Sequence, residues 1–245
     1  MKDRFSEQAQ AYSNFRPEYP EALFKYIFSV INTFDSAWDC GTGNGQVAYP
    51  LAQRFKKVIA TDISVKQLEN AKQHAQISYL QMPAEQTNFE AGSFNLVTVA
   101  QAIHWFDFDK FYSEVKRVLK PGGYIAVIGY GFLQTENEMQ NLLQNFYAGT
   151  LGQYWDAERK YIDENYATIP FPFKEIEAPS FSIKYTWNAA QLLGYLGTWS
   201  ACKNFEKENA KNALGLISAD VYKLWANRSV EITFPILLRI GVHTH

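Results

Sequence analysis

The sequence predicts a doubly wound α/β fold with a mostly parallel sheet, and three observations support this prediction. Short apolar runs alternate with stretches of helical periodicity between residues 36 and 131. The apolar runs are nearly continuous, which is typical of parallel strands that helices cover on both faces. A cluster of three glycines follows the first apolar run and opens a helical stretch, where α/β folds place a nucleotide-binding loop.

Seven strands are expected along the chain. Five are short apolar runs in the first half, and two are longer β-like stretches in the second half. The expected ranges are 37–40, 57–63, 78–82, 94–101, 124–131, 176–187 and 230–242. Between the first five strands the connections are long enough for helices, so these five strands should be parallel.

Helix signals lie between these strands. A helix is expected over 47–55, behind the glycine cluster. Ser64 and Gln67 have the spacing of a capping box, which predicts a helix that begins there. Asp107 is expected to cap a further helix, and the Lys-Pro-Gly-Gly sequence at 120–123 to end it. Later helical stretches are expected at 134–149, 189–199, 205–217 and 219–226.

We expect residues 1–245 to form one domain, because there is no linker rich in proline, glycine or serine and no internal repeat. An N-terminal segment (1–35) precedes the core (36–131). The C-terminal part (132–245) includes a helical insertion near 188–228, which should act as a cap.

Composition limits the classes of function. Hydrophobic residues make up 47% of the chain and the net charge is −2, which excludes a disordered protein and argues against nucleic-acid or membrane partners. Two cysteines cannot form a disulfide framework, and the first residues lack the apolar stretch of a secretory signal, so we expect a cytoplasmic protein. His243 and His245 have no third ligand nearby, so no metal is expected.

The glycine cluster reads Asp-Cys-Gly-Thr-Gly-Asn-Gly over 39–45. Gly41, Gly43 and Gly45 have no Cβ atom, so the backbone can turn tightly and approach a ligand closely. Asp62 ends the second expected strand, where its carboxylate can accept two hydrogen bonds from a ribose diol.

Two classes of ligand compete for this loop. A dinucleotide fingerprint, G-x-G-x-x-G, requires its last glycine where this chain has Gln46. Asp39 lies two residues before the first glycine, and its carboxylate would repel a pyrophosphate but attract a cationic amino-acid head. The residues therefore favour a nucleoside that bears an ammonium group, with a nicotinamide-dependent oxidoreductase as the alternative.

Residues 39–45 resemble motif I of the class I S-adenosylmethionine-dependent methyltransferases, whose pattern is D/E-x-G-x-G-x-G. Asp62 resembles their ribose-binding acid, and Arg-Val-Leu-Lys-Pro-Gly-Gly at 117–123 resembles a helix-to-strand passage of the ubiquinone-methyltransferase-like branch. The resemblance covers about residues 36–130. It implies a Rossmann-like fold, an enzyme that transfers methyl groups, and S-adenosyl-L-methionine as the cofactor.

The resemblance also implies roles for individual residues. The backbone of the glycine loop would underlie the methionine and ribose parts of the cofactor. The other implied contacts are Asp39 at the amino group, Asp62 at the ribose, Ile63 on an adenine face, Ala84 and Glu85 at the adenine edge, and the carbonyl of Gln101 at the methionine end.

The N-terminal stretch resembles, more loosely, the lead segment of the trans-aconitate methyltransferases. The matching residues are Phe5, Ala9, Tyr12, Arg16, Pro17, Tyr19 and Pro20. In that family an Arg–Tyr pair folds over the carboxylate end of the cofactor, which implies this role for Arg16 and Tyr12. We therefore expect residues 1–20 to order over the cofactor and the acceptor to be a small molecule.

His104 follows the fourth expected strand by three residues and should lie near the transferred methyl group. A neutral imidazole there could accept a proton from a hydroxyl nucleophile or orient a carboxylate. A histidine that only packs beneath Trp105 is the remaining alternative. The expected lining of an acceptor pocket is Tyr19, Trp105, Trp155, Tyr195 and Trp199.

The resulting expectation is methyl transfer to a carboxylate or hydroxyl of a small molecule, with release of S-adenosylhomocysteine. The chain lacks the Asn-Pro-Pro-Tyr motif that enzymes acting on adenine or glutamine amines carry after the fourth strand. Two alternatives stay open: a protein that binds S-adenosylmethionine without turnover, and a methyltransferase that acts on a macromolecule.

Overall fold

The structure is a computed structural model and describes residues 15–244. Its centre is an eight-stranded sheet in the order β3-β2-β1-β4-β5-β8-β6, with β7 paired to β8. The strands are β1 (Ser36–Cys40), β2 (Lys57–Asp62), β3 (Ile77–Gln81), β4 (Phe94–Ala100), β5 (Leu119–Tyr130), β6 (Lys174–Ile176), β7 (Ser182–Trp187) and β8 (Val230–Val242). The first five strands are parallel, and β8 runs antiparallel to β5, β6 and β7.

The predicted fold class is confirmed, with eight strands in place of the expected seven. The single strand expected over 176–187 is split into β6 and β7. β6 pairs with the end of β8, whereas β7 pairs with its beginning. The break contains Pro179, which has no N–H group to donate to a strand ladder.

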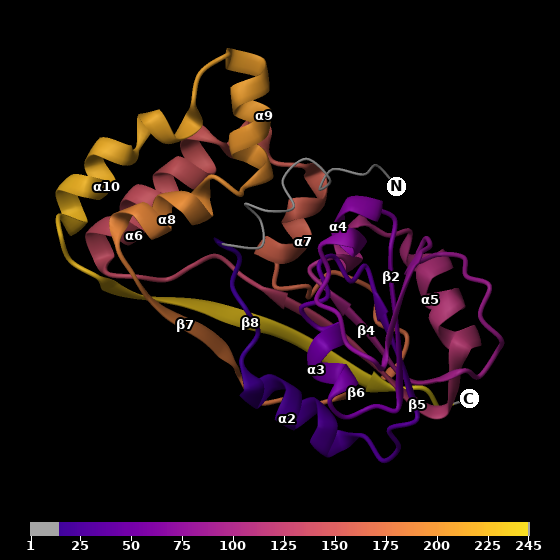
Figure 1. Cartoon of the computed structure of the whole chain (residues 1–245). Coiled ribbons are helices and arrows are strands. Elements are labelled where there is room, and N and C mark those ends of the chain that lie inside the picture. The colour runs from indigo at the N-terminus through magenta and orange to yellow at the C-terminus, as the bar shows by residue number, and fades with distance from the viewer. Residues whose placement is uncertain (1–14, 245) are drawn as a thin grey trace.

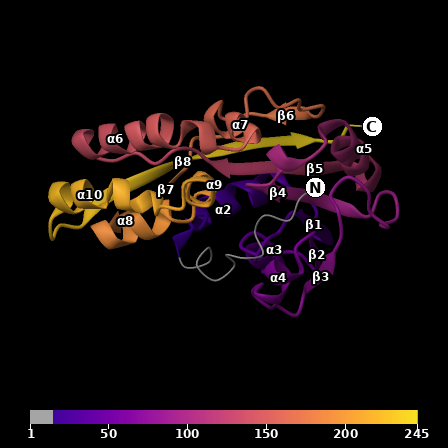
Figure 2. The same cartoon turned by 90° about the horizontal axis from the view of Figure 1, so that it is seen from above.

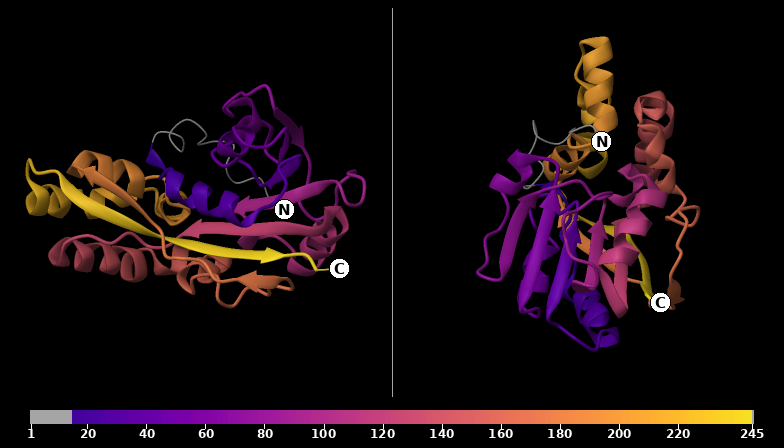
Figure 3. Two further views of the ribbon diagram at one scale, coloured as in Figure 1. Left: turned by 90° about the horizontal axis from the view of Figure 1, so that it is seen from below. Right: turned by 90° about the vertical axis from the view of Figure 1, so that its right-hand side faces the viewer.

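Helices cover both faces of the sheet. They are α2 (Glu21–Val30), α3 (Ala48–Ala52), α4 (Val65–Glu69), α5 (Phe108–Val118), α6 (Asn137–Gln144), α7 (Lys160–Asp163), α8 (Ala189–Leu196), α9 (Ser200–Asn209) and α10 (Ser218–Trp225). Ala37 and its neighbour Trp38 belong to separate buried clusters, since successive side chains of a strand point to opposite faces. The Ala37 cluster includes α2 and α3, and the Trp38 cluster includes α5 on the other face (Figure 3).

A third buried cluster lies around the end of β7 and the beginning of β8 (Figure 1). Figure 2 shows α6 on one side of these two strands and α8 and α10 on the other. The helices α8, α9 and α10 fall in the segment 188–228 that was expected to form a cap. The ring of Trp187 packs on those of Tyr195 and Phe234, which joins the helices to the strands.

Local structure differs from the expectations at several helices. The single helix expected over 205–217 is instead α9, which begins at Ser200 and ends at Asn209, and a separate 3-10 turn over Ala213–Leu216. The helix predicted behind Ser64 is only α4, because the Asn70 side chain donates to the carbonyl of Lys66 and the amide of Lys72 donates to the carbonyl of Asn44. The helix α2 was not expected, although its buried face of Leu23, Phe24 and Ile27 has helical spacing. No helix within residues 15–244 is long and apolar enough to span a bilayer.

Candidate functional site

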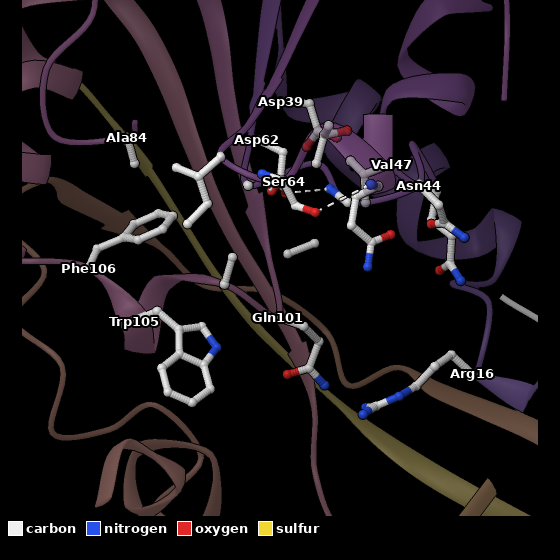
Figure 4. A pocket seen from close by; sticks show the side chains of 18 of the residues that line it. Arg16, Asp39, Asn44, Val47, Asp62, Ser64, Ala84, Gln101, Trp105 and Phe106 are labelled. Carbon is white, nitrogen blue, oxygen red and sulfur yellow. Dashed lines mark hydrogen bonds between the residues drawn. The ribbon is translucent and has the colours of Figure 1, made fainter. Parts of the chain in front are cut away.

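A cavity lies at the carboxyl ends of β1, β2 and β4 (Figure 4). It encloses about 1050 Å³ of empty space, including the part that is open to solvent. The connection from β1 leads to β2 on one side, whereas β4 lies on the other side of β1. Such a change of direction separates the loops at the strand ends and leaves room for a ligand.

The glycine loop forms one wall of this cavity with a backbone that other residues rarely adopt. Gly41, Gly43 and Gly45 have φ angles of 63°, 55° and 80°. A Cβ atom at Gly41 would lie 2.7 Å from the Cβ of Ala102, and one at Gly45 would overlap the hydroxyl of Tyr79. Gly41 and Gly43 line the cavity, whereas Gly45 lies at the turn into α3 and is not part of the lining.

Asp62 joins the end of β2 to the glycine loop and to α4. Its Oδ2 accepts a hydrogen bond from the amide of Gly43, and its Oδ1 accepts one from the amide of Ser64, both at 2.9 Å. A carboxylate has about four lone-pair positions, so this side chain can still accept from a diol. Asp62 and Ile63 both line the cavity, as the sequence led us to expect.

Asp39 lies behind the loop and holds it in place. The side chain is 1% exposed, and its carboxylate accepts hydrogen bonds from the hydroxyls of Thr42 at 2.5 Å and Thr98 at 2.7 Å. Burial raises the pKa of Asp39 to about 6, although these hydrogen bonds oppose the shift. The two threonines thus pair both carboxylate oxygens of Asp39, which nevertheless lines the cavity.

The segments after β3 and β4 supply apolar lining. Ala84 lines the cavity, but Glu85 does not, because its carboxylate accepts from the amide of Asp107 at 3.3 Å, just before α5. Met82 and Phe106 line it too, although neither was predicted as a cofactor contact. Met82 directly follows β3, and that position is the signal that could have identified it, whereas Phe106 lies beyond the 3-10 turn that follows β4.

The N-terminal segment closes another side of the cavity. Arg16 and Tyr19 both line it, while Tyr12 lies outside the described residues. The guanidinium of Arg16 donates to the hydroxyl of Tyr130 at 3.0 Å and to the carbonyl of Thr198 at 3.1 Å. Arg16 thus connects the N-terminal segment to β5 and to the turn between α8 and α9.

A second cavity adjoins the first and shares Arg16, Gln101 and Trp105 with it. It has about 550 Å³ of empty space, including the part that is open to solvent. Its lining includes three more residues that the sequence singled out: His104, Trp155 and Trp199. It also includes four residues that sequence reasoning missed: Asp156, Arg159, Ile162 and Ser200. Tyr195 lines neither cavity, because it is buried against Trp187 and Trp199, and Tyr19 lines only the first.

His104 is buried in the wall of the second cavity. Burial, together with the positive charges of Arg159 and Arg16, lowers the pKa of His104 to about 3, so the imidazole is neutral at neutral pH. The hydroxyl of Tyr166 lies 3.5 Å from both His104 Nδ1 and Gln101 Oε1. Tyr166 was not predicted, and it links the end of β4 to this histidine.

Arg159 is fixed at the second cavity by aromatic rings and an acid. Its Nε donates to the hydroxyl of Tyr147 at 2.8 Å and lies 3.3 Å from a carboxylate oxygen of Asp163. The guanidinium carbon lies 4.8 Å from the ring centroid of Trp155, within range of a cation–π interaction. Among the described residues, its two Nη groups have no hydrogen-bond partner.

These residues fit a nucleoside that bears an amino-acid head. Gly41 and Gly43 line the cavity without a Cβ atom, so a ligand has close access to their backbone. Asp62 offers a carboxylate for a diol, and Ile63, Ala84 and Phe106 offer apolar surface for a base. The fold and the cavity together define a Rossmann-like nucleoside-binding protein.

Comparisons with known proteins identify its family. A family model for the methyltransferase domain matches residues 38–127. A protein of Dictyostelium discoideum named as a methyltransferase is 34% identical, over 96% of this chain and 93% of its own. A solved structure described as a type II methyltransferase from Anaeromyxobacter dehalogenans has a TM-score of 0.86 and 37% identity, over 94% of this chain and 98% of that one. A Saccharomyces cerevisiae relative named as an S-adenosylmethionine-dependent methyltransferase is 23% identical, over 90% of this chain and 86% of its own.

The chain belongs to the class I S-adenosylmethionine-dependent methyltransferases, and S-adenosylmethionine is its cofactor. The family predicted from the glycine loop is thereby confirmed, and the alternative of a nicotinamide-dependent oxidoreductase is set aside. When bound, this cofactor supplies a methyl group on a positively charged sulfur, which a nucleophile can displace. Gly41, Gly43 and Asp62 line the cavity and are the residues that could hold it.

Proposed function

We propose that this methyltransferase acts on a small molecule that binds in the second cavity and presents an oxygen, most favourably a carboxylate oxygen. The observation behind this proposal is the wall that the two cavities share, at Arg16, Gln101 and Trp105. An acceptor in the second cavity would be next to the methionine end of the cofactor.

Charge in the second cavity favours an anionic acceptor. Among its lining residues, Arg16 and Arg159 outnumber the one acid, Asp156. Within the described part of the chain, Asp163 pairs with Arg159 only at Nε, which leaves the Nη groups for a ligand. The Nη groups of Arg159 can form the paired hydrogen bonds that a planar guanidinium makes with a carboxylate. Trp105, Trp155 and Trp199 supply flat apolar surface for the body of such an acceptor.

His104 would act according to the acceptor. A carboxylate is already ionised at neutral pH and needs no base, so a neutral imidazole would only orient it. A hydroxyl acceptor loses a proton on methylation, and His104 would be a weak base for that proton because its pKa is about 3, so a carboxylate acceptor fits this site better. In both cases Trp105 and the neighbouring rings keep water from the reacting oxygen. The predicted likeness to the trans-aconitate branch remains part of this proposal.

A panel of small aromatic and aliphatic acids, with their amides and alcohols, tests the proposal by measuring S-adenosylhomocysteine formation. We expect turnover with acids and little with their amides. Arg159→Gln should lower kcat/KM for an acid by about ten- to a hundredfold, since a charged paired contact is lost. Lys160→Gln is the matched control, because this neighbouring cation does not line the cavity.

Other results would overturn the proposal. Methyl incorporation from cell extract into material that protease or nuclease digests would indicate a macromolecular acceptor. Cofactor binding without turnover on the panel or the extract would indicate a protein that only binds S-adenosylmethionine.

A cytoplasmic location is also proposed; its support is that Cys40 and Cys202 are buried and unpaired, as thiols are in a reducing compartment.

A further inference from the structure

Gln67 places a polar atom without a partner in the wall of the cofactor cavity. The side chain is 3% exposed, and its Oε1 lies 4.0 Å from the point where a Cβ atom on Gly43 would be. Among residues 15–244, no group donates a hydrogen bond to this oxygen. An unpaired buried acceptor is costly and rare, so this one requires an explanation.

Comparison of two helix starts, at α4 and at α8, shows how this oxygen is left unpaired. At α8, Gln191 Oε1 accepts from the amide of Asn188 at 3.0 Å, and Asn188 accepts from the amide of Gln191, which completes the capping box. At α4, Ser64 accepts from the amide of Gln67, but the amide of Ser64 donates to Asp62 instead. The predicted box is therefore only half formed. Asp62 has replaced Gln67 Oε1 as the acceptor.

We propose that Gln67 is a cofactor-binding residue whose Oε1 accepts a hydrogen bond from a ribose hydroxyl of S-adenosylmethionine. Asp62 both displaces the Gln67 oxygen from the helix cap and holds the amide of Gly43, the glycine whose Cβ position lies 4.0 Å from that oxygen. The amide oxygen and the carboxylate of Asp62 thus line the same part of the cavity. Both groups are acceptors, and two acceptors match the two donors of a ribose diol.

This arrangement makes opposite demands on the free and the bound protein. Without ligand, the unpaired oxygen lowers the stability of the fold. With ligand, the same oxygen is paired and contributes to affinity. Replacement by a side chain of similar shape without polar atoms should therefore weaken binding without destabilising the free protein.

Gln67→Met tests this by calorimetric titration with S-adenosylhomocysteine and by thermal unfolding of the ligand-free protein. We expect affinity to fall about tenfold while Tm stays the same or rises. Gln191→Met is the matched control: loss of its cap contact should lower Tm and leave affinity unchanged. Unchanged affinity in Gln67→Met would overturn the proposal, and so would a Tm loss like that of Gln191→Met, which would indicate a structural role.

Nucleoside analogues identify the group that Gln67 binds. 5′-Methylthioadenosine lacks the amino-acid head, so Gln67→Met should weaken its binding as much as that of S-adenosylhomocysteine. Methylthioadenosine without its 2′-hydroxyl and methylthioadenosine without its 3′-hydroxyl are then compared. The analogue that lacks the hydroxyl donating to Gln67 should bind the parent and Gln67→Met equally, whereas the other should still bind Gln67→Met more weakly. An equal penalty for both deoxy forms would overturn the assignment to the ribose.

Discussion

At the scale of single residues, two buried titratable groups have opposite pKa shifts. Burial raises the pKa of Asp39 to about 6, and burial with two nearby guanidiniums lowers the pKa of His104 to about 3. Between about pH 4 and pH 6, folding therefore favours proton uptake at Asp39 and proton release at His104. The effects on stability oppose each other in this window.

Separating the two groups gives a prediction with a defined sign. In His104→Gln the contribution of the histidine is removed and that of Asp39 remains, so relative to the parent the free energy of unfolding should rise as pH falls from 6 towards 4. In Asp39→Asn the contribution of Asp39 is removed and that of His104 remains, so relative to the parent the free energy of unfolding should fall over the same range. Each change approaches about 1.4 kcal/mol per pH unit for one proton. Denaturant unfolding at several pH values measures both slopes, and equal slopes in the two variants would contradict the pKa shifts.

At the scale of elements, the glycine loop after β1 packs closely against the segment that follows β4. A Cβ atom at Gly41 would lie 2.7 Å from the Cβ of Ala102, and the φ angle of Gly41 is 63°. A side chain at Gly41 is therefore disfavoured for two separate reasons: the left-handed backbone and the short distance to Ala102. Gln101, directly before Ala102, also has a positive φ, of 51°, which is rare outside glycine.

Gly41→Ala should destabilise the protein by about 2–3 kcal/mol, from the left-handed backbone and from the collision. Ala102→Gly in the same chain should recover the part due to the collision and leave the backbone part. Denaturant unfolding of the two single variants and the double variant measures this coupling. Additive effects would show that the loop moves away from Ala102 at no cost.

At the scale of the whole molecule, the two cavities unite segments from the entire chain. Arg16 precedes the sheet, His104 follows β4, and Arg159 and Trp199 come from the C-terminal half. The contacts of Arg16 with Tyr130 and Thr198 join three of these parts. Ligand binding should therefore stabilise the fold as a unit.

S-adenosylhomocysteine at a hundred times its Kd should stabilise the protein by about 2.7 kcal/mol, and NADH should not. Asp62→Ala should lower affinity by about ten- to a hundredfold and reduce the stabilisation at the same ligand concentration. Thermal unfolding with each ligand measures these shifts. An undiminished shift in a folded Asp62→Ala protein would remove the ribose role from this carboxylate.

The sequence alone determined the fold class, the family and the cofactor. Asp39, the glycine loop and Asp62 carry that information because a tight loop and an acid at a strand end are local features with set spacing. Strand and helix periodicity placed the first five strands within one to five residues of their ends. The sequence also pointed to His104, Trp155 and Trp199, which the structure places together in the second cavity.

Only the tertiary structure decided which side chains meet. Arg159 and Tyr166 lie far from His104 in sequence, so no periodicity or motif connects them. Of the two hydrogen bonds of the capping box predicted at Ser64, the one from the amide of Gln67 to Ser64 is present. The amide of Ser64 donates to Asp62, at the end of the preceding strand, and not to the side chain of Gln67. Local spacing determines hydrogen bonds along a helix or strand, whereas the partners of a buried polar group are set by packing between elements.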